Sequence, residues 1–94
     1  MTATVEDNPA RSRYELRIDD AITFVAYEMG EGRLILTHTE VPKELAGRGI
    51  GSTVARDVLD AIRARGLKVI PRCPFIAAFI ERHPECRDLI AAST

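Results

Sequence analysis

Alternating apolar and polar residues predict that the first half of the chain is built of β-strands. The alternation is strict over residues 13–19, where charged residues form one face and apolar residues the other: Tyr14, Leu16 and Ile18. A period of two predicts a strand with one buried face. Residues 21–29 are richer in apolar and β-branched residues, so we expect a second, more central strand after a tight turn at Asp19-Asp20.

A third strand is predicted over residues 33–41, after a hairpin turn at 29–33 in which Gly30 and Gly32 are free to take positive φ. Alternate residues of a regular strand share a face, and the even-numbered residues form one such set: Leu34, Leu36, His38 and Glu40. The residues change from apolar to polar along the strand. We therefore expect the strand to leave the core and to line a site at its C-terminal end.

The hydrophobic period becomes helical over residues 50–65, where apolar residues recur at every fourth position: Ile50, Val54, Val58 and Ile62. Gly66 suits the end of this helix, and the apolar residues 67–70 predict a short strand after it. Strand, helix and strand with short connections form a βαβ unit. The third strand and the strand at 67–70 should therefore be parallel, with a right-handed crossover.

A second helix is predicted over residues 74–83, because Pro74 suits a first helical position and a second proline stops the helix after residue 83. Phe75 and Phe79 lie one turn apart, and we expect both in the core. Residues 87–92 have a weaker pattern, which allows a short turn or an edge segment.

Length and composition narrow the class of protein. The chain has 94 residues, 46% of them hydrophobic, which predicts one domain over residues 13–94 after a loose, polar tail at residues 1–12. A net charge of −1 without a basic stripe argues against a nucleic-acid partner. No apolar run is long enough to span a membrane, and the N-terminus lacks a secretion-signal pattern. Two cysteines without metal-ligand spacing predict free thiols and no metal site. We expect a cytoplasmic protein that is a monomer or a weak dimer.

The stretch from Val41 to Ser52 connects the third strand to the first helix and has glycines at positions 47, 49 and 51. Glycine permits positive φ and close approach of a ligand, and a helix N-terminus carries about half a positive charge. We therefore expect the main-chain N–H groups between Ala46 and Ser52 to bind a phosphate or diphosphate. In a βαβ unit the ligand lies at the carboxyl ends of the strands, so Glu40 and Cys73 should converge on this turn.

Motifs in this order resemble the GNAT superfamily of N-acetyltransferases, and more narrowly its small, single-domain YjdJ-like subfamily. They are His-Thr-Glu-Val-Pro at 38–42, Leu-Ala-Gly-Arg-Gly-Ile-Gly-Ser at 45–52, Cys-Pro-Phe at 73–75 and Arg-His-Pro-Glu at 82–85. The resemblance implies an α/β (α+β) fold with a mixed, mostly antiparallel sheet, one βαβ crossover and two main helices. It also implies that acetyl-CoA is the cosubstrate.

The superfamily pattern Arg/Gln-x-x-Gly-x-Gly/Ala falls on residues 46–51, where both glycines match and Ala46 replaces the usual Arg or Gln. The resemblance implies that the pantetheine arm lies between the ends of the two parallel strands. The implied cofactor-binding residues are Val41, Ala46, Gly47, Arg48, Gly49, Ile50, Gly51, Ser52, Cys73, Pro74 and Phe75. The subfamily lacks the helices that usually cover the acceptor site. Its acceptor side should be open and suit a large or exposed amine, such as one on a protein.

Three residues are candidates for the chemistry. Cys73 is either a small buried residue or a thiol beside the acetyl thioester, the role that the subfamily resemblance favours. No Tyr follows it, although superfamily members often place one there as the general acid. Glu40 is either a solvated carboxylate or the general base for the attacking amine. His38 is either a structural histidine or a proton relay.

The function expected from these residues is transfer of an acetyl group from acetyl-CoA to an unidentified amine by direct attack. A covalent acetyl-Cys73 route is the secondary mechanism. Two alternatives remain open: a non-catalytic CoA-binding module, and an interaction protein in which the glycine turn is only a tight connection.

Overall fold

The structure, a computed structural model, describes residues 5–18, 20–45, 47 and 49–91. Within these residues five strands form one sheet, in chain order: β1 (Glu6–Asn8), β2 (Arg13–Ile18), β3 (Ala21–Gly30), β4 (Arg33–Glu40) and β5 (Lys68–Pro71). Neighbouring strands from β1 to β4 are antiparallel, and β5 pairs with β4 in parallel. The mixed, mostly antiparallel sheet with one parallel crossover confirms the predicted fold class.

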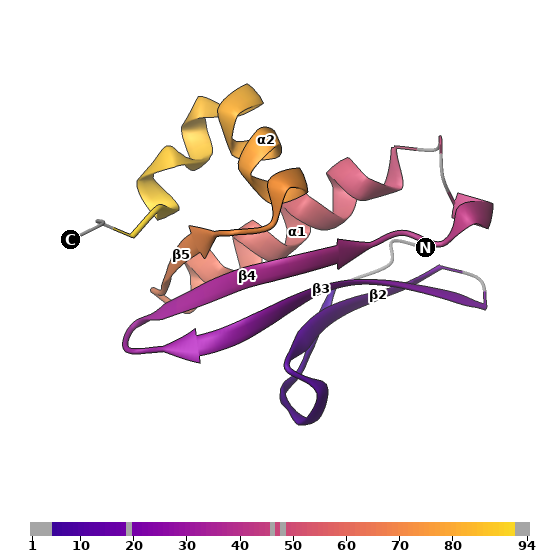
Figure 1. The fold of residues 1–94 in the computed structure, drawn as a ribbon, viewed down its shortest axis with the longest axis horizontal. Helices are drawn as coiled ribbons and strands as arrows, with labels where there is room; N and C mark the ends of the chain where they lie inside the picture. The colour runs from indigo at the N-terminus through magenta and orange to yellow at the C-terminus, as the bar shows by residue number, and fades with distance from the viewer. Residues whose placement is uncertain (1–4, 19, 46, 48, 92–94) are drawn as a thin grey trace.

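Both longer helices lie on the same face of the sheet (Figure 1). Helix α1 (Ile50–Ala64) connects β4 to β5, and α2 (Pro74–Arg82) follows β5. The described part of the chain also has three short 3₁₀ helices: η1 (Pro9–Arg11), η2 (Lys43–Leu45) and η3 (Pro84–Leu89). Among the described residues, no helix has both the length and the apolar character that crossing a membrane requires.

The hydrophobic core lies between the helices and the face of the sheet that they cover. Helix α1 contributes an apolar stripe of buried residues at helical spacing: Val54, Ala55, Val58, Leu59 and Ile62. Strands β2, β3 and β4 contribute residues that alternate along each strand: Tyr14, Leu16, Val25, Tyr27, Leu34 and Leu36. Burying a large aliphatic side chain contributes about 1.5–3 kcal/mol, so these contacts hold α1 across the sheet.

Helix α1 ends where the sequence predicts, at a glycine in the left-handed conformation. Gly66 has a φ of 72°, and its N–H donates to the carbonyl of Arg63 while the next N–H donates to that of Ile62. These bonds satisfy carbonyls left over at the helix end and lead the chain directly into β5. In the β3–β4 turn, Gly32 takes a φ of 68°, whereas Gly30 stays in the strand without a positive φ.

The N-terminal segment differs from the predicted loose tail. Residues 6–8 form β1, which pairs with β2, and η1 leads the chain back into β2. The carboxylate of Asp7 holds this edge strand, because it accepts hydrogen bonds from Tyr27 Oη (2.6 Å) and Arg65 Nη1 (3.3 Å). Burial, together with the hydrogen bond to Asp7, raises the pKa of Tyr27 to about 12. So short a strand has no periodicity to predict it, and the two side chains that hold Asp7 are distant from it in sequence.

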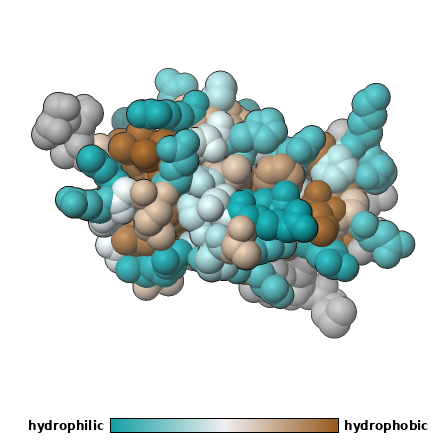
Figure 2. All heavy atoms as spheres, turned by 60° about the horizontal axis from the view of Figure 1, so that its bottom comes forward, coloured by the Kyte–Doolittle hydropathy of each residue, from teal (hydrophilic) through white to brown (hydrophobic). Residues whose placement is uncertain are grey.

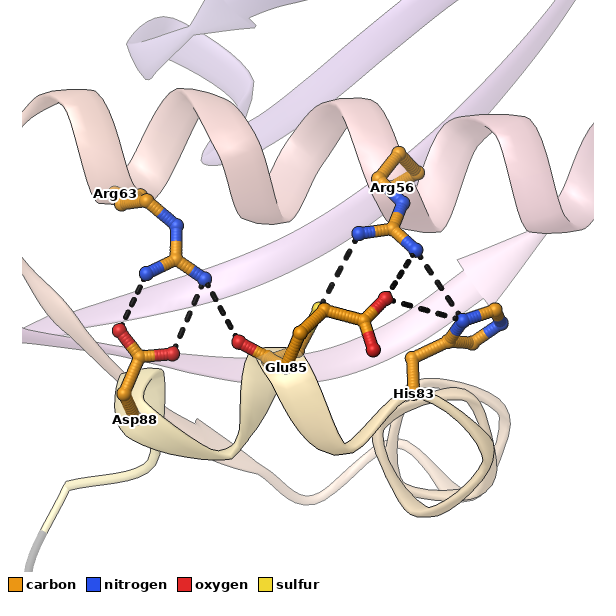
Figure 3. A network of polar contacts seen from close by, with 6 residues as sticks. Arg56, Arg63, His83, Glu85 and Asp88 are labelled. Atoms are coloured by element: carbon orange, nitrogen blue, oxygen red, sulfur yellow. Dashed lines mark hydrogen bonds and ion pairs between the residues drawn. The ribbon is translucent and has the colours of Figure 1, made fainter.

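Ion pairs fasten η3 to α1 (Figure 3). Arg56 Nη2 donates to Glu85 Oε2 at 2.7 Å and lies 3.2 Å from His83 Nδ1. Further along α1, the two terminal guanidinium nitrogens of Arg63 donate to the carboxylate of Asp88. These hydrogen bonds lower the pKa of Glu85 and of Asp88. The ion pairs thus hold the segment after α2 against the first half of the fold.

After η3 the chain reaches the outer edge of β5. Ile90 forms a parallel bridge with Val69, and the N–H of Ala91 donates to the carbonyl of Val69 at 2.8 Å. Cys86, within η3, is 1% exposed, as expected for a structural cysteine. The sequence pattern allowed a short turn or an edge segment over residues 87–92, and the structure has both as far as residue 91.

Candidate functional site

Strands β4 and β5 separate part-way along β4. They pair as far as Leu36 opposite Pro71, and the N–H of Cys73 still donates to the carbonyl of Leu36 at 2.8 Å. Strand β4 continues to Glu40, while the chain after Pro71 turns into α2. Among the described residues, the last part of β4 therefore has a partner strand on its β3 side alone. The two strands diverge at their carboxyl ends, where the sequence predicts the ligand.

A β-bulge at Thr37 determines which way the polar residues of β4 face. Leu36 and His38 lie opposite adjacent residues of β3, so Thr37 is an extra residue in β4. One extra residue reverses the alternation of side chains between the two faces. The prediction that His38 and Glu40 share a face with Leu36 is therefore wrong.

On the helix-covered face, Thr39 lies against Cys73. Thr39 is opposite Val25 of β3, whose side chain is fully buried, and its Oγ1 is 3.3 Å from Cys73 Sγ. Cys73 is 4% exposed and occupies the N-cap position of α2. A hydroxyl and a thiol therefore meet at the point where β4 and β5 diverge.

On the opposite, uncovered face, the side chains of His38 and Glu40 are 63% and 60% exposed, with His38 Nε2 3.9 Å from Glu40 Oε2. The ring of Phe24 lies edge-on to the His38 ring at 6.1 Å, and the guanidinium of Arg13 lies 4.3 Å above the Phe24 ring. Figure 2 brings this side of the molecule forward and shows hydrophilic surface with separate apolar patches. The predicted convergence of Glu40 with Cys73 therefore holds for strand position but not for side-chain direction.

Gly47 and Gly49 of the glycine turn are exposed, and the turn leads into α1. Gly47 and Gly49 have φ angles of 84° and 73°, a conformation that side chains disfavour. Among the described residues, the first helical hydrogen bond runs from the N–H of Thr53 to the carbonyl of Gly49 at 3.1 Å. The N–H groups of residues 50–52 precede it, and no described residue accepts a hydrogen bond from them. They form the positive end of the helix dipole.

The remaining predicted cofactor residues surround this turn and the start of α2. Val41 is half-buried just after β4, and Ser52 is exposed in the first turn of α1. Pro74 is the first residue of α2, as predicted. Ala46 and Arg48 lie outside the described residues, so the predictions for them stay predictions.

Phe75 joins the two helix N-termini instead of lying in the core. Phe79 is 1% exposed, as predicted, but Phe75 is 36% exposed. The Phe75 ring packs against Gly51, where an added Cβ would lie 2.7 Å from Cζ of the ring. The missing side chain at Gly51 thus makes room for an aromatic ring, a reason for glycine that the sequence analysis missed.

An apolar hollow of about 550 Å³ lies elsewhere, between α2, the end of β5 and the C-terminal segment. Its lining residues are Pro71, Ala77, Ile80, Glu81, Arg87, Ile90 and Ala91. None of the predicted site residues lines it, so it is separate from the site described here.

A family model described as GCN5-related N-acetyl-transferase matches residues 13–89. The chain belongs to the GCN5-related N-acetyltransferase family. Protein NATD1 of Mus musculus is 31% identical over 84 residues, which cover 85% of this chain and 76% of that protein. Protein NATD1 of Homo sapiens is also 31% identical over 84 residues, covering 85% of this chain and 74% of that protein.

The GCN5-related fold is also that of a solved structure. The solution structure of a GCN5-like putative N-acetyltransferase from Staphylococcus aureus matches with a TM-score of 0.70 and 22% identity. The match covers 96% of this chain and 89% of that one. At this identity, the likeness shows a common fold.

Two residues that shape this GCN5-related site escaped the sequence analysis. Thr37 forms the bulge, and Thr39 contacts the thiol of Cys73. Both belong to an alternating segment that reads as a regular strand, and neither has a local signal of its own. A bulge appears only when the register of β4 against β3 is known.

Proposed function

We propose that this GCN5-related protein binds acetyl-CoA and transfers the acetyl group to an amine. The observation that carries the proposal is the divergence of β4 and β5 near the N-terminus of α1, to which the start of α2 is joined by the contact of Phe75 with Gly51. A ligand with an anionic diphosphate and a long flexible arm suits this arrangement, because the anion favours the helix N-terminus and the arm fits between separating strands.

The glycine turn would hold the diphosphate. The N–H groups of residues 50–52 and the positive end of the helix dipole favour a negative charge. Gly47 and Gly49 have no side chains, so phosphate oxygens can approach the backbone closely. Arg48 would add a cation to the same site, and Ala46 would contribute its main-chain N–H.

The pantetheine arm would run between the end of β4 and the start of α2. Val41 would form one wall, and Cys73 and Pro74 the other. The exposed part of the Phe75 ring would offer an apolar surface near the diphosphate, because Phe75 packs on Gly51 of the same helix N-terminus. This path would bring the thioester toward the point where β4 and β5 diverge.

In the proposed reaction, the amine nitrogen attacks the thioester carbonyl carbon and the carbon–sulfur bond breaks. The amine loses a proton, and the departing CoA thiolate gains one. Main-chain N–H groups would stabilise the negative charge that develops on the carbonyl oxygen. The amine can approach from the uncovered face of the sheet, because no helix of the described residues covers it there.

Glu40 and His38 would act on that uncovered face. Both side chains are exposed, and the 3.9 Å between Nε2 and Oε2 allows a proton to pass between them with small adjustment. Glu40 would take the proton of the amine, directly or through a water, and His38 would relay it. A face without helices suits an amine on a large molecule such as a protein.

Cys73 offers a second route on the helix-covered face. Its thiolate would attack the thioester and CoA would leave as a thiolate. The amine would then attack the acetyl-Cys73 carbonyl and release the Cys73 thiolate, and the proton that the amine loses would pass to the CoA thiolate. This route leaves the overall transfer unchanged and would show as an acetyl group on the Cys73 peptide by mass spectrometry.

Ser52→Glu tests the diphosphate site. The substitution puts a carboxylate in the first turn of α1, where it repels a diphosphate but complements the helix dipole. We expect calorimetry to show a CoA affinity reduced by about tenfold or more, because a charge repulsion of about 1.4 kcal/mol raises the dissociation constant tenfold. The thermal stability of the variant should not fall. Ala78→Glu adds the same charge at an exposed position of α2 and should leave CoA affinity unchanged. Equal affinities of Ser52→Glu and wild type would place the diphosphate elsewhere.

Thiol release from acetyl-CoA with a panel of amines tests the transfer. A non-catalytic CoA-binding module is the second candidate, because no Tyr follows Cys73 and Cys73 is nearly buried. CoA binding without release across the panel would favour that candidate. If CoA neither binds nor raises the melting temperature, the chain is better described as an interaction protein.

A further inference from the structure

We infer that Thr39 is a positioning residue for Cys73, an inference that rests on the covalent route proposed above. Thr39 Oγ1 lies 3.3 Å from Cys73 Sγ. Among the described residues, no other group forms a hydrogen bond with this sulfur. This hydroxyl is therefore the polar group that can orient the thiol.

The bulge at Thr37 brings the hydroxyl to the thiol. In a regular strand His38 would share the helix-covered face with Leu36, and Thr39 would face away from Cys73. The extra residue exchanges their places, so Thr39 meets Cys73 while His38 lies on the uncovered face. A threonine at position 39 and an insertion two residues earlier thus act together.

The backbone of Cys73 is held on both sides, which leaves the side-chain torsion as its main freedom. The N–H of Cys73 donates to the carbonyl of Leu36 at 2.8 Å, and its own carbonyl accepts from the N–H of Ala77 at 3.0 Å. A hydroxyl that donates to the sulfur selects one rotamer of the thiol. It also forms a charge-assisted hydrogen bond when the sulfur is a thiolate, the form that attacks an electrophile.

The first experiment measures alkylation of Cys73 in the full chain by iodoacetamide, with the modified peptide quantified by mass spectrometry. Thr39→Val keeps the shape of the side chain and removes the hydroxyl, and Thr39→Ser restores a hydroxyl. We expect alkylation about tenfold slower in Thr39→Val and close to wild type in Thr39→Ser, because a hydrogen bond to a charged group is lost in the first variant alone.

Cys86 is an internal control in the same tubes. It is 1% exposed and lies 3.7 Å from Arg56 Nη1, away from the substituted residue. Its alkylation reports opening of the whole fold, so the ratio of the Cys73 rate to the Cys86 rate isolates the local effect. An unchanged ratio in Thr39→Val, or a ratio in Thr39→Ser equal to that in Thr39→Val, would overturn the inference.

A second measurement connects the contact to the proposed function. With acetyl-CoA, Thr39→Val should slow formation of acetyl-Cys73 and leave the dissociation constant for CoA unchanged, and Thr39→Ser should restore the rate. Weaker CoA binding in Thr39→Val would overturn a pure positioning role. If the wild type does not bind CoA, the proposed function fails, but the alkylation ratio still decides whether Thr39 orients the thiol.

Discussion

Because Gly51 contacts Phe75, we predict that the effect of Gly51→Ala on the free energy of unfolding changes sign with the residue at position 75. Replacing Gly by Ala inside a helix normally stabilises a protein by about 0.5–1 kcal/mol. Here the added Cβ would lie 2.7 Å from Cζ and 3.3 Å from Cε1 of the Phe75 ring. Carbon atoms pack at about 3.5–4.0 Å, so the ring must move.

The ring is 36% exposed, so it can swing outward while the backbone stays in place. Forced repacking of this kind costs about 1–3 kcal/mol. We therefore expect Gly51→Ala to lower the free energy of unfolding by about 1 kcal/mol. In a Phe75→Leu background the colliding ring atoms are gone, and the same substitution should raise it by about 0.5 kcal/mol.

Denaturant unfolding of four proteins measures this coupling: wild type, both single variants and the double variant. The expected interaction energy of about 1.5 kcal/mol exceeds the scatter of about 0.3–0.5 kcal/mol seen for independent sites. Gly30→Ala is the matched control, because its nearest contact would be Arg33 Cγ at an ordinary 3.4 Å. If Gly51→Ala has the same effect in both backgrounds, the ring does not limit position 51 and our reasoning is refuted.

Two further predictions concern ionisable groups. The pKa of Tyr27 is raised to about 12 in the folded protein, above the value of about 10 in an unfolded chain. The protonated Tyr27 therefore stabilises the fold fully at pH values below the unfolded pKa, and this contribution is lost as the pH rises through the folded pKa. Tyr27→Phe should cost about 1 kcal/mol at neutral pH and flatten the stability curve in that alkaline window, as urea midpoints would show. The hydrogen bond from Arg63 lowers the pKa of Asp88 in the folded protein. The ionised Asp88 therefore stabilises the fold at pH values above its unfolded pKa, and this contribution is lost as the pH falls through the folded pKa. Asp88→Asn should lower the melting temperature at neutral pH and make the melting temperature fall less on acidification. Asp20→Asn is the control: it removes an exposed carboxylate without a described ion pair and should change neither quantity.

Local patterns were enough to predict strands β2 to β5 and the two longer helices. The alternation that starts at residue 13 predicted β2, and the four-residue spacing from Ile50 to Ile62 predicted α1. Gly66 was correctly assigned to the helix end, because a left-handed residue there needs glycine whatever surrounds it. The parallel pairing of β4 and β5 followed from the order strand, helix, strand.

What the sequence alone determined about this protein is therefore its periodic framework and the place of its glycine turn, since both depend on neighbours within a few positions. Tertiary structure decided three other features: β1 at the sheet edge, the ring of Phe75 on Gly51, and the bulge at Thr37. Each depends on a partner from another element, and periodicity carries no information about such partners. The bulge matters most for the proposed function, because it turns Thr39 toward Cys73 and His38 toward the uncovered face.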